Sequence, residues 1–298
     1  MIVVQVIVPT FLLVAIGYAA GRLATFDLRT LSNLALYVLT PSLVFSRTYA
    51  SPLEAALIGR IALYTFFIVG AMFAIALSVS RVLRLPRADA AAFLLSVSLF
   101  NAGNMGLPII LFAFGEQGLT YAVVVVVSHV LLTSTVGVFV AANARMGKRE
   151  ALKQVFALPG VYAIALGFFL GHGGVALPEA IRKPVELLGA AAIPVNTAIL
   201  GVQLSRAARP IGLGVAGVAS AMRLLVAPLL GAALLPLLGF SGLAYKVMLL
   251  QTSMPSAVYS AILSERFEAN EVLAAHAVLL STLLSALSIS VLLLVVAT

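Results

Sequence analysis

Two short polar clusters, each ending in a proline, interrupt apolar stretches of the sequence. The first reads Asn101-Ala-Gly-Asn-Met-Gly-Leu-Pro108 and the second reads Gln251-Thr-Ser-Met-Pro255. Amide side chains both donate and accept hydrogen bonds, which suits a carboxylate oxygen or an unwound backbone carbonyl. Glycine and proline weaken helical hydrogen bonding, so each cluster predicts a break in a helix. The residues expected at the crossover of the two broken helices are Gly103, Gly106, Pro108, Met254 and Pro255.

The two breaks predict a binding site at the point where they meet. Freed backbone groups are tolerated at membrane depth only where protein covers them or where they line a cavity. Two broken helices that cross would place four half-helix ends around one point, where N-terminal ends attract an anion and C-terminal carbonyls attract a cation. The structural alternative is a pair of proline kinks satisfied by neighbouring serine and threonine side chains. Substrate-binding residues expected at the meeting point are Asn101, Asn104, Gln251 and Thr252.

Arg223 is a single charged residue inside the apolar region from Pro210 to Leu238. If its helix starts near Ile211, the guanidinium lies about 18 Å along the helix, which is mid-membrane. A charge at that depth is typical of a functional residue, here an anion partner or an internal counter-ion. If the helix starts nearer Val218, the side chain extends to the inner surface instead. We include Arg223 among the candidate substrate-binding residues.

Three more residues are candidates for proton or ion coupling. His129 and His276 lie inside apolar stretches and titrate near neutrality, so they could relay protons. Each could equally be a neutral histidine hydrogen-bonded to a neighbouring helix. Ser253, with the adjacent amides and hydroxyls of the two clusters, offers the oxygen ligands that sodium prefers. All ten carboxylates fall in expected loops or at helix ends, which argues against a buried acidic proton carrier.

The composition indicates a polytopic membrane protein. Apolar residues make up 62% of the chain and charged residues 9%, far below the roughly 25% of soluble domains. The absence of cysteine excludes disulfides, thiolate metal sites and cysteine nucleophiles, and we expect no cofactor beyond a possible coupling ion, Na⁺ or H⁺. The net charge of +8 comes from basic residues placed singly between apolar runs, so it indicates membrane flanks rather than a nucleic-acid partner.

Uncharged stretches long enough to cross a bilayer predict an all-α protein of ten transmembrane helices. Positive-inside counting places twelve basic residues in inner loops and five outside, which predicts that both termini lie outside an inner (plasma) membrane. The first five helices fall in residues 1–142, a short cytoplasmic linker in 143–154, and the other five in 155–298. The stretches are 1–21, 30–46, 61–80, 90–115, 117–144, 154–178, 187–205, 210–238, 243–264 and 272–298.

The two five-helix halves carry matching residues at nearly constant offsets, which predicts an internal repeat. Each half has an odd number of spans, so the second copy enters from the opposite side, as in many secondary transporters. The alternative is that glycine and proline are simply frequent in membrane helices. The matched sets are Pro9, Gly17 and Gly21 with Pro159, Gly167 and Gly171 at an offset of 150, Pro41 with Pro194 at 153, and Asn104, Pro108 and His129 with Gln251, Pro255 and His276 at 147.

Several of these segments resemble the auxin efflux carrier (PIN-like) family. They are Leu36-Tyr-Val-Leu-Thr-Pro41, the asparagine seven residues before Pro108, and Gln251-Thr-Ser-Met-Pro255 followed by Ser264-Glu-Arg-Phe267. The resemblance covers essentially the whole chain. It implies a fold similar to sodium/proton antiporters and bile-acid symporters, with crossed broken helices four and nine. It also implies a scaffold domain from spans 1, 2, 6 and 7 that carries a homodimer contact, and a transport domain from spans 3–5 and 8–10.

The resemblance further implies that Asn101 and Gln251 bind substrate, and that Thr40 and Asn196 on the scaffold spans face the substrate across the cavity. Packing of Thr40 and Asn196 between helices is the alternative. Members of the family move small organic anions, including auxin and dicarboxylates. This chain lacks the long central hydrophilic loop of the plant members, which puts a plant hormone substrate in doubt.

These observations favour a secondary active or facilitative transporter of a small organic anion, a carboxylate, working by alternating access with the substrate at the Pro108/Pro255 crossover. The alternatives are a sodium-coupled symporter of the bile-acid type and a non-transporting membrane receptor. An enzyme is disfavoured, because the sequence has no His-Glu-x-x-His motif, no serine–histidine pair at plausible spacing and no acidic dyad. The expected partners are the substrate anion, the lipid bilayer and a second copy of the chain.

Overall fold

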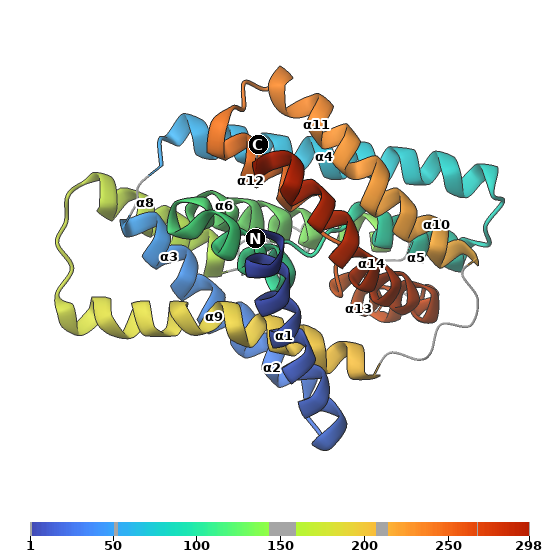
Figure 1. Cartoon of the computed structure of the whole chain (residues 1–298), viewed down its shortest axis with the longest axis horizontal. Helices are drawn as coiled ribbons and strands as arrows, with labels where there is room; N and C mark the ends of the chain where they lie inside the picture. Colours follow the sequence, from blue (N-terminus) through green and yellow to red (C-terminus); the bar gives the residue numbers. More distant parts are fainter. Residues whose placement is uncertain (1, 51–52, 143–158, 207–213, 267, 298) are drawn as a thin grey trace.

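A computed structural model describes residues 2–50, 53–142, 159–206, 214–266 and 268–297 of the chain. All regular elements in these ranges are helical (Figure 1), and seven helices are long and apolar enough to cross a membrane. The all-α membrane architecture is therefore confirmed. The count of ten spans stays a prediction, because several remaining helices are too short to cross alone. The linker expected at 143–154 lies outside the described residues.

The elements follow one another along the chain as α-helices with three π-helical turns, labelled η. They are α1 (Ile2–Leu23), α2 (Leu28–Leu34), η1 (Ala35–Leu39), α3 (Thr40–Ala50), α4 (Ala55–Val82), α5 (Arg87–Ser98), η2 (Ala102–Gly106), α6 (Leu107–Ala142), α8 (Pro159–His172), α9 (Glu179–Arg206), α10 (Gly214–Ala221), η3 (Met222–Val226), α11 (Ala227–Leu237), α12 (Gly242–Thr252), α13 (Tyr259–Arg266) and α14 (Glu271–Ala297).

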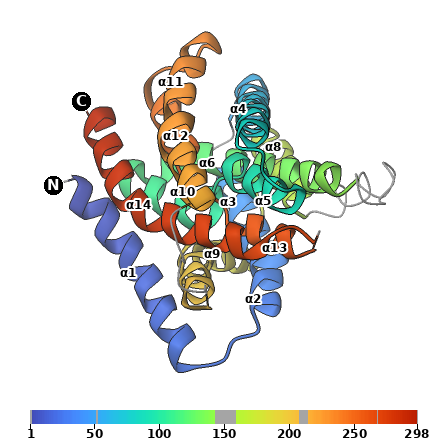
Figure 2. The same cartoon turned by 90° about the vertical axis from the view of Figure 1, so that its right-hand side faces the viewer.

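Burial separates central helices from peripheral ones. On α1, Val4, Val8, Leu12 and Ile16 form a stripe at helical spacing, and each is more than half exposed. Such an apolar stripe suits contact with lipid rather than water. Residues 92–98 of α5, in contrast, are all buried, because α4, α10, α13 and α14 surround that helix. Figure 2 shows α1 at the edge of the molecule and α5 within the group of helices.

Two peripheral helix pairs, α1 with α9 and α3 with α8, pack through glycine. A Cβ added to Gly17 would overlap the carbonyl oxygen of Ala198, so the backbones of α1 and α9 are in contact there. On α8, a Cβ at Gly167 would lie 2.9 Å from the carbonyl oxygen of Phe45 on α3. Close backbone approach through small residues is the usual way in which membrane helices associate.

These two contacts involve residues at matching sequence offsets. Gly17 and Gly167 are 150 residues apart, and their neighbours Phe45 and Ala198 are 153 apart, the offset seen for the prolines of the same helices. The next glycine of each helix repeats the match: Gly21 approaches Val202, and Gly171 approaches Tyr49, again a pair 153 apart. The glycine positions thus make corresponding contacts in the two halves of the chain.

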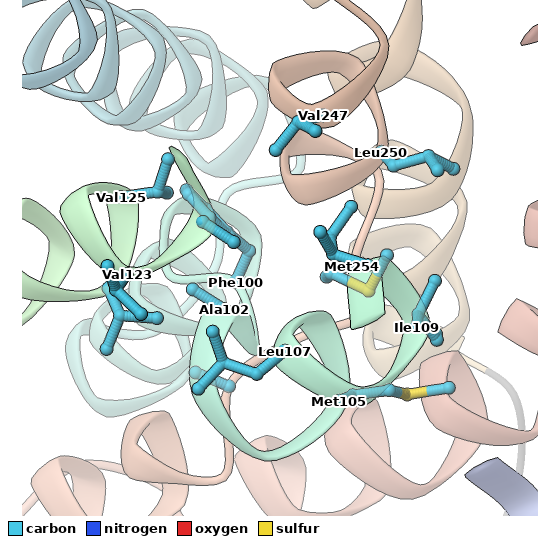
Figure 3. Packing of buried hydrophobic residues seen from close by; sticks show 14 of the residues in the cluster. Phe100, Ala102, Met105, Leu107, Ile109, Val123, Val125, Val247, Leu250 and Met254 are labelled. Atoms are coloured by element: carbon cyan, nitrogen blue, oxygen red, sulfur yellow. The ribbon is translucent and has the colours of Figure 1, made fainter. Parts of the chain in front are cut away.

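Two helix breaks lie side by side at the centre of the molecule. The first separates α5 from η2 at residues 99–101, and the second separates α12 from α13 at 253–258. Phe100 and Ser256 form an antiparallel bridge, in which the Asn101 amide donates to the Pro255 carbonyl at 2.8 Å and the Ala257 amide donates to the Leu99 carbonyl at 2.9 Å. Figure 3 shows apolar side chains, including Met105 and Met254, packed around this junction.

The first break begins earlier than the glycines and proline of its cluster predict. Gly103 lies in η2, and Pro108 lies in α6, which continues η2 without interruption, so both residues are inside the helix that follows the break. Pro255, by contrast, lies inside the second break. The unwound backbone therefore precedes Asn101 rather than following it, and Asn101 becomes the N-cap of the helix that starts at η2.

Candidate functional site

A cavity of about 230 Å³ lies beside the first break. It is bounded by η1, α3 and α9 on one side and by η2, α6 and α13 on the other. Four of the seven predicted substrate-binding residues line it, namely Asn101, Asn104, Thr40 and Asn196, together with Gly103 and His129 from the other predicted sets. Gln251, Thr252, Arg223, Gly106, Pro108, Ser253, Met254, Pro255 and His276 do not line it.

Asn101 lines this cavity and carries a buried side-chain donor that is not used within the described residues. Its side-chain Oδ1 accepts a hydrogen bond from the Asn104 amide at 3.1 Å, which caps η2. Its Nδ2 is buried and makes no hydrogen bond within the described part of the chain, although the residue is only 5% exposed. A buried amide without a partner is costly, so a ligand acceptor in the cavity would relieve that cost.

Two helix N-termini also face the cavity. The helix that begins at Ala102 contributes Ala102, Gly103 and Asn104, and α13 contributes Tyr259 at its first residue. An N-terminus carries about half a positive charge, so it attracts anions. None of the residues that line this cavity is charged. On the cavity wall itself, helix ends and amide donors are therefore the groups that can attract an anion.

The opposite helix ends, the C-termini of α5 and α12, are joined by Arg223. This residue lies in η3 and its side chain is fully buried. Nη1 donates to the Val97 carbonyl at 3.0 Å, Nη2 donates to the Thr252 carbonyl, and the guanidinium carbon lies 5.3 Å from the centre of the Phe100 ring. Arg223 therefore does not reach the surface. Of the alternatives from the sequence, this geometry matches the internal counter-ion.

Helix α9 contacts η2 directly, just after the first break. The Thr197 hydroxyl donates to the Asn104 carbonyl at 3.0 Å, and it also bonds within its own helix. Asn196 donates to the Thr40 hydroxyl at 3.4 Å, which joins α9 to α3 beside the cavity. Both residues named by the family resemblance thus lie at the cavity, opposite Asn101.

His129 supports the first break from α6. Its Nε2 accepts a hydrogen bond from the Phe100 amide at 3.2 Å, so the ring is neutral there and carries its hydrogen on Nδ1. In the second break, the Ser256 amide donates to the Ser281 hydroxyl at 3.1 Å. His276 is buried away from the cavity, and its Nε2 has no hydrogen bond to any described residue. Proton relay by either histidine stays a prediction.

Gln251 is buried against the helix that follows the first break. A Cβ at Gly106 would lie 2.9 Å from the Gln251 amide carbon, so this glycine makes room for the side chain. Neither amide atom of Gln251 has a partner among the described residues. The Thr252 and Tyr64 hydroxyls share a hydrogen bond of 2.6 Å, and the Ser253 hydroxyl donates to the Leu249 carbonyl at 2.7 Å. These residues build the junction rather than the cavity wall.

Sequence reasoning missed four polar residues of the cavity wall, which are Ser32, Thr133, Gln203 and Tyr259. Gln203 lies near the end of α9, close to Arg206, and in the sequence it is indistinguishable from a polar helix end. Its Oε1 is buried and has no hydrogen bond within the described ranges. The sequence could have indicated Gln203 as a cavity residue, because it lies two turns after Asn196 on the same face of the helix.

Comparison with known proteins supports a transport role. A family model described as a membrane transport protein matches residues 2–293. An uncharacterized transporter of Methanocaldococcus jannaschii is 27% identical over 301 residues, which cover 97% of each chain. An uncharacterized transporter of Methanothermobacter thermautotrophicus is 27% identical over 293 residues, which cover 96% of this chain and 95% of the relative.

Proposed function

Because the chain belongs to the membrane transport protein family, the auxin efflux carrier (PIN-like) family, we propose that it moves a small organic carboxylate across the membrane by alternating access. Members of this family are transporters and not enzymes. The chain itself is a multi-pass membrane protein with several apolar helices. We further propose that the carboxylate binds as an anion.

The cavity beside Asn101 carries this proposal. It combines a buried, unpartnered amide donor with the N-termini of two helices, and its wall has no charged side chain. Such a wall suits an anion whose apolar part contacts Phe100 and Val126 while its carboxylate meets the helix ends. A cationic substrate would find no acidic group among these residues.

The placement of the cavity supports alternating access. One wall belongs to the proposed scaffold of α1, α2–α3, α8 and α9, and the other belongs to the proposed transport domain of α4–α6 and α10–α14. Matching glycine contacts in the two halves and the paired breaks support ten spans in an inverted repeat, with a crossover at the breaks. Movement of one domain would break the Thr197–Asn104 hydrogen bond.

The remaining parts of the proposal concern placement in the cell. We place the chain in the inner (plasma) membrane with both termini outside, on the distribution of basic residues. The homodimer contact expected from the family resemblance would use the scaffold helices.

Asn101→Asp tests the proposal, because aspartate keeps the acceptor that caps η2 but removes the donor and adds a negative charge. Losing one buried hydrogen bond to a ligand costs about 1–3 kcal/mol, so affinity for carboxylates should fall by roughly fivefold to a hundredfold or more. The measurement is calorimetric titration of purified protein with benzoate, phenylacetate and hexanoate. Asn33→Asp, at an exposed position of α2 outside the cavity, is the matched control. Unchanged affinity in Asn101→Asp would place the substrate elsewhere, and a parent protein that binds none of these carboxylates would contradict the proposal.

A further inference from the structure

The buried guanidinium of Arg223 lies between two helix C-termini, whose free carbonyl groups attract positive charge. The C-termini of α5 and α12 end at the paired breaks, and their carbonyl groups at Val97 and Thr252 point to Arg223. Each helix C-terminus carries about half a negative charge, so the two ends together carry about one. One guanidinium therefore matches them in charge and uses separate nitrogens for the two carbonyls.

The cavity has the opposite arrangement, because helix N-termini with partial positive charge face it. The N-termini at Ala102 and Tyr259 together supply about one positive charge, again half from each helix end. No charged side chain on the cavity wall alters this sum. Phe100 links the two regions, because its ring contacts Arg223 while the residue also lines the cavity.

From the charges of these helix C-termini and N-termini we propose that Arg223 is a built-in counter-ion of the paired breaks. It fills the place of an inorganic coupling cation and leaves the cavity matched to an anion with a single negative charge. This inference rests on the proposed function and deepens it, because it names the charge class of the substrate and the residue that sets it. Arg223 acts as a positioning residue, since it contacts the breaks and not the cavity.

The first experiment uses the unmodified protein and varies the salt and the ligand charge. Carboxylate affinity and thermal unfolding are measured in sodium chloride and in choline chloride, because choline is too large for a cation site between two carbonyls. We expect equal values in both salts. Benzoate should bind at least about tenfold more tightly than phthalate, and hexanoate more tightly than adipate, because the second carboxylate finds no partner in the cavity.

The second experiment removes the guanidinium and returns it as a free ion. Taking a separation of about 9 Å, which adds a van der Waals contact to the distance from Arg223 to the ring centre, the lost charge should weaken carboxylate binding roughly twentyfold at an effective dielectric of about 20. Arg223→Ala should melt at a lower temperature than the parent. Millimolar methylguanidinium should raise its melting temperature and its carboxylate affinity.

Arg60→Ala is the matched control, because Arg60 also donates to a backbone carbonyl, that of Gly239, and also lies over a ring, that of Phe240. Arg60 is exposed and far from the breaks in sequence, so methylguanidinium should not affect this variant. Carboxylate binding that requires sodium in the parent would overturn the counter-ion inference while leaving the proposed function intact. The inference is likewise overturned if phthalate binds as well as benzoate, or if Arg223→Ala binds benzoate with unchanged affinity.

Discussion

Replacing Gly17 by alanine tests the backbone contact between α1 and α9. The new methyl group would lie 2.7 Å from the Ala198 carbonyl carbon, whereas carbon atoms in contact are about 3.5–4.0 Å apart. The two helices must therefore separate by about 0.8 Å or more. Since the obstacle is backbone and no rotamer change can relieve it, we expect a destabilisation near the upper end of the overpacking range, about 3 kcal/mol.

Gly70→Ala is the matched control for this substitution. Gly70 lies inside α4, and a Cβ there meets no atom within 4 Å. Alanine should then stabilise the helix by about 0.5–1 kcal/mol, because glycine loses more backbone freedom on folding. Both substitutions add the same methyl group to a membrane helix, so the difference in stability between Gly17→Ala and Gly70→Ala reports the contact of α1 with α9.

A third variant, Gly167→Ala, should have an intermediate effect on stability. Its methyl group would meet the Phe45 carbonyl at 2.9 Å and the Thr48 side chain, which can shift by giving up its hydrogen bond to the Val44 carbonyl, so the cost should fall between the other two. The assay is reversible unfolding of purified protein in mixed detergent micelles, followed by circular dichroism. The expected order of stability is Gly70→Ala, parent, Gly167→Ala, Gly17→Ala. A Gly17→Ala protein as stable as the parent would refute the close approach of α1 and α9.

Three further predictions concern single polar contacts. His129→Leu leaves a buried amide of the first break unpaired and should cost about 1–3 kcal/mol in the same unfolding assay, whereas His129→Gln, which keeps an acceptor, should cost clearly less. The Arg47–Glu116 ion pair joins α3 to α6 at a partly exposed position, so a double-mutant cycle should give a coupling of about 0–1 kcal/mol, and a larger value would contradict this. Asp27 caps α2, and the hydrogen bond from the Thr30 hydroxyl is the main cause that lowers its pKa. The resulting stabilisation is present at neutral pH and is lost as the pH falls through that lowered pKa, so Asp27→Ala and the parent should differ in melting temperature at neutral pH and converge in acid.

The polar clusters could be found from the sequence because polar residues beside glycine and proline stand out in an apolar chain. The position of the first break could not. It depends on the backbone pairing of Phe100 with Ser256, a contact between residues 156 positions apart that no local pattern encodes. Pro108 is misleading, because it lies within the continuous helix formed by η2 and α6, several residues after the break.

Arg223 shows a second limit of local reasoning. Its predicted depth depended on where its own helix begins, and residues 207–213, just before that helix, lie outside the described ranges. Its partners are backbone carbonyls at Val97 and Thr252, which carry no signature in the side-chain sequence. Gln251 was predicted in the cavity but lies in the junction, because Gly106 leaves space for it there.

The hydrogen bonds between the two breaks run from backbone to backbone, which has a consequence for how this protein can vary. The amide of Asn101 and the carbonyl of Pro255 belong to the main chain, as do the amide of Ala257 and the carbonyl of Leu99. Main-chain pairing does not depend on most side-chain identities, so cavity residues other than Asn101 and His129, whose side chains hold the first break, can be substituted without loss of this pairing. In these residues the main-chain atoms hold the two breaks together, whereas the side chains determine which substrate fits. New specificities can arise at these positions by point substitution, while the architecture is inherited unchanged.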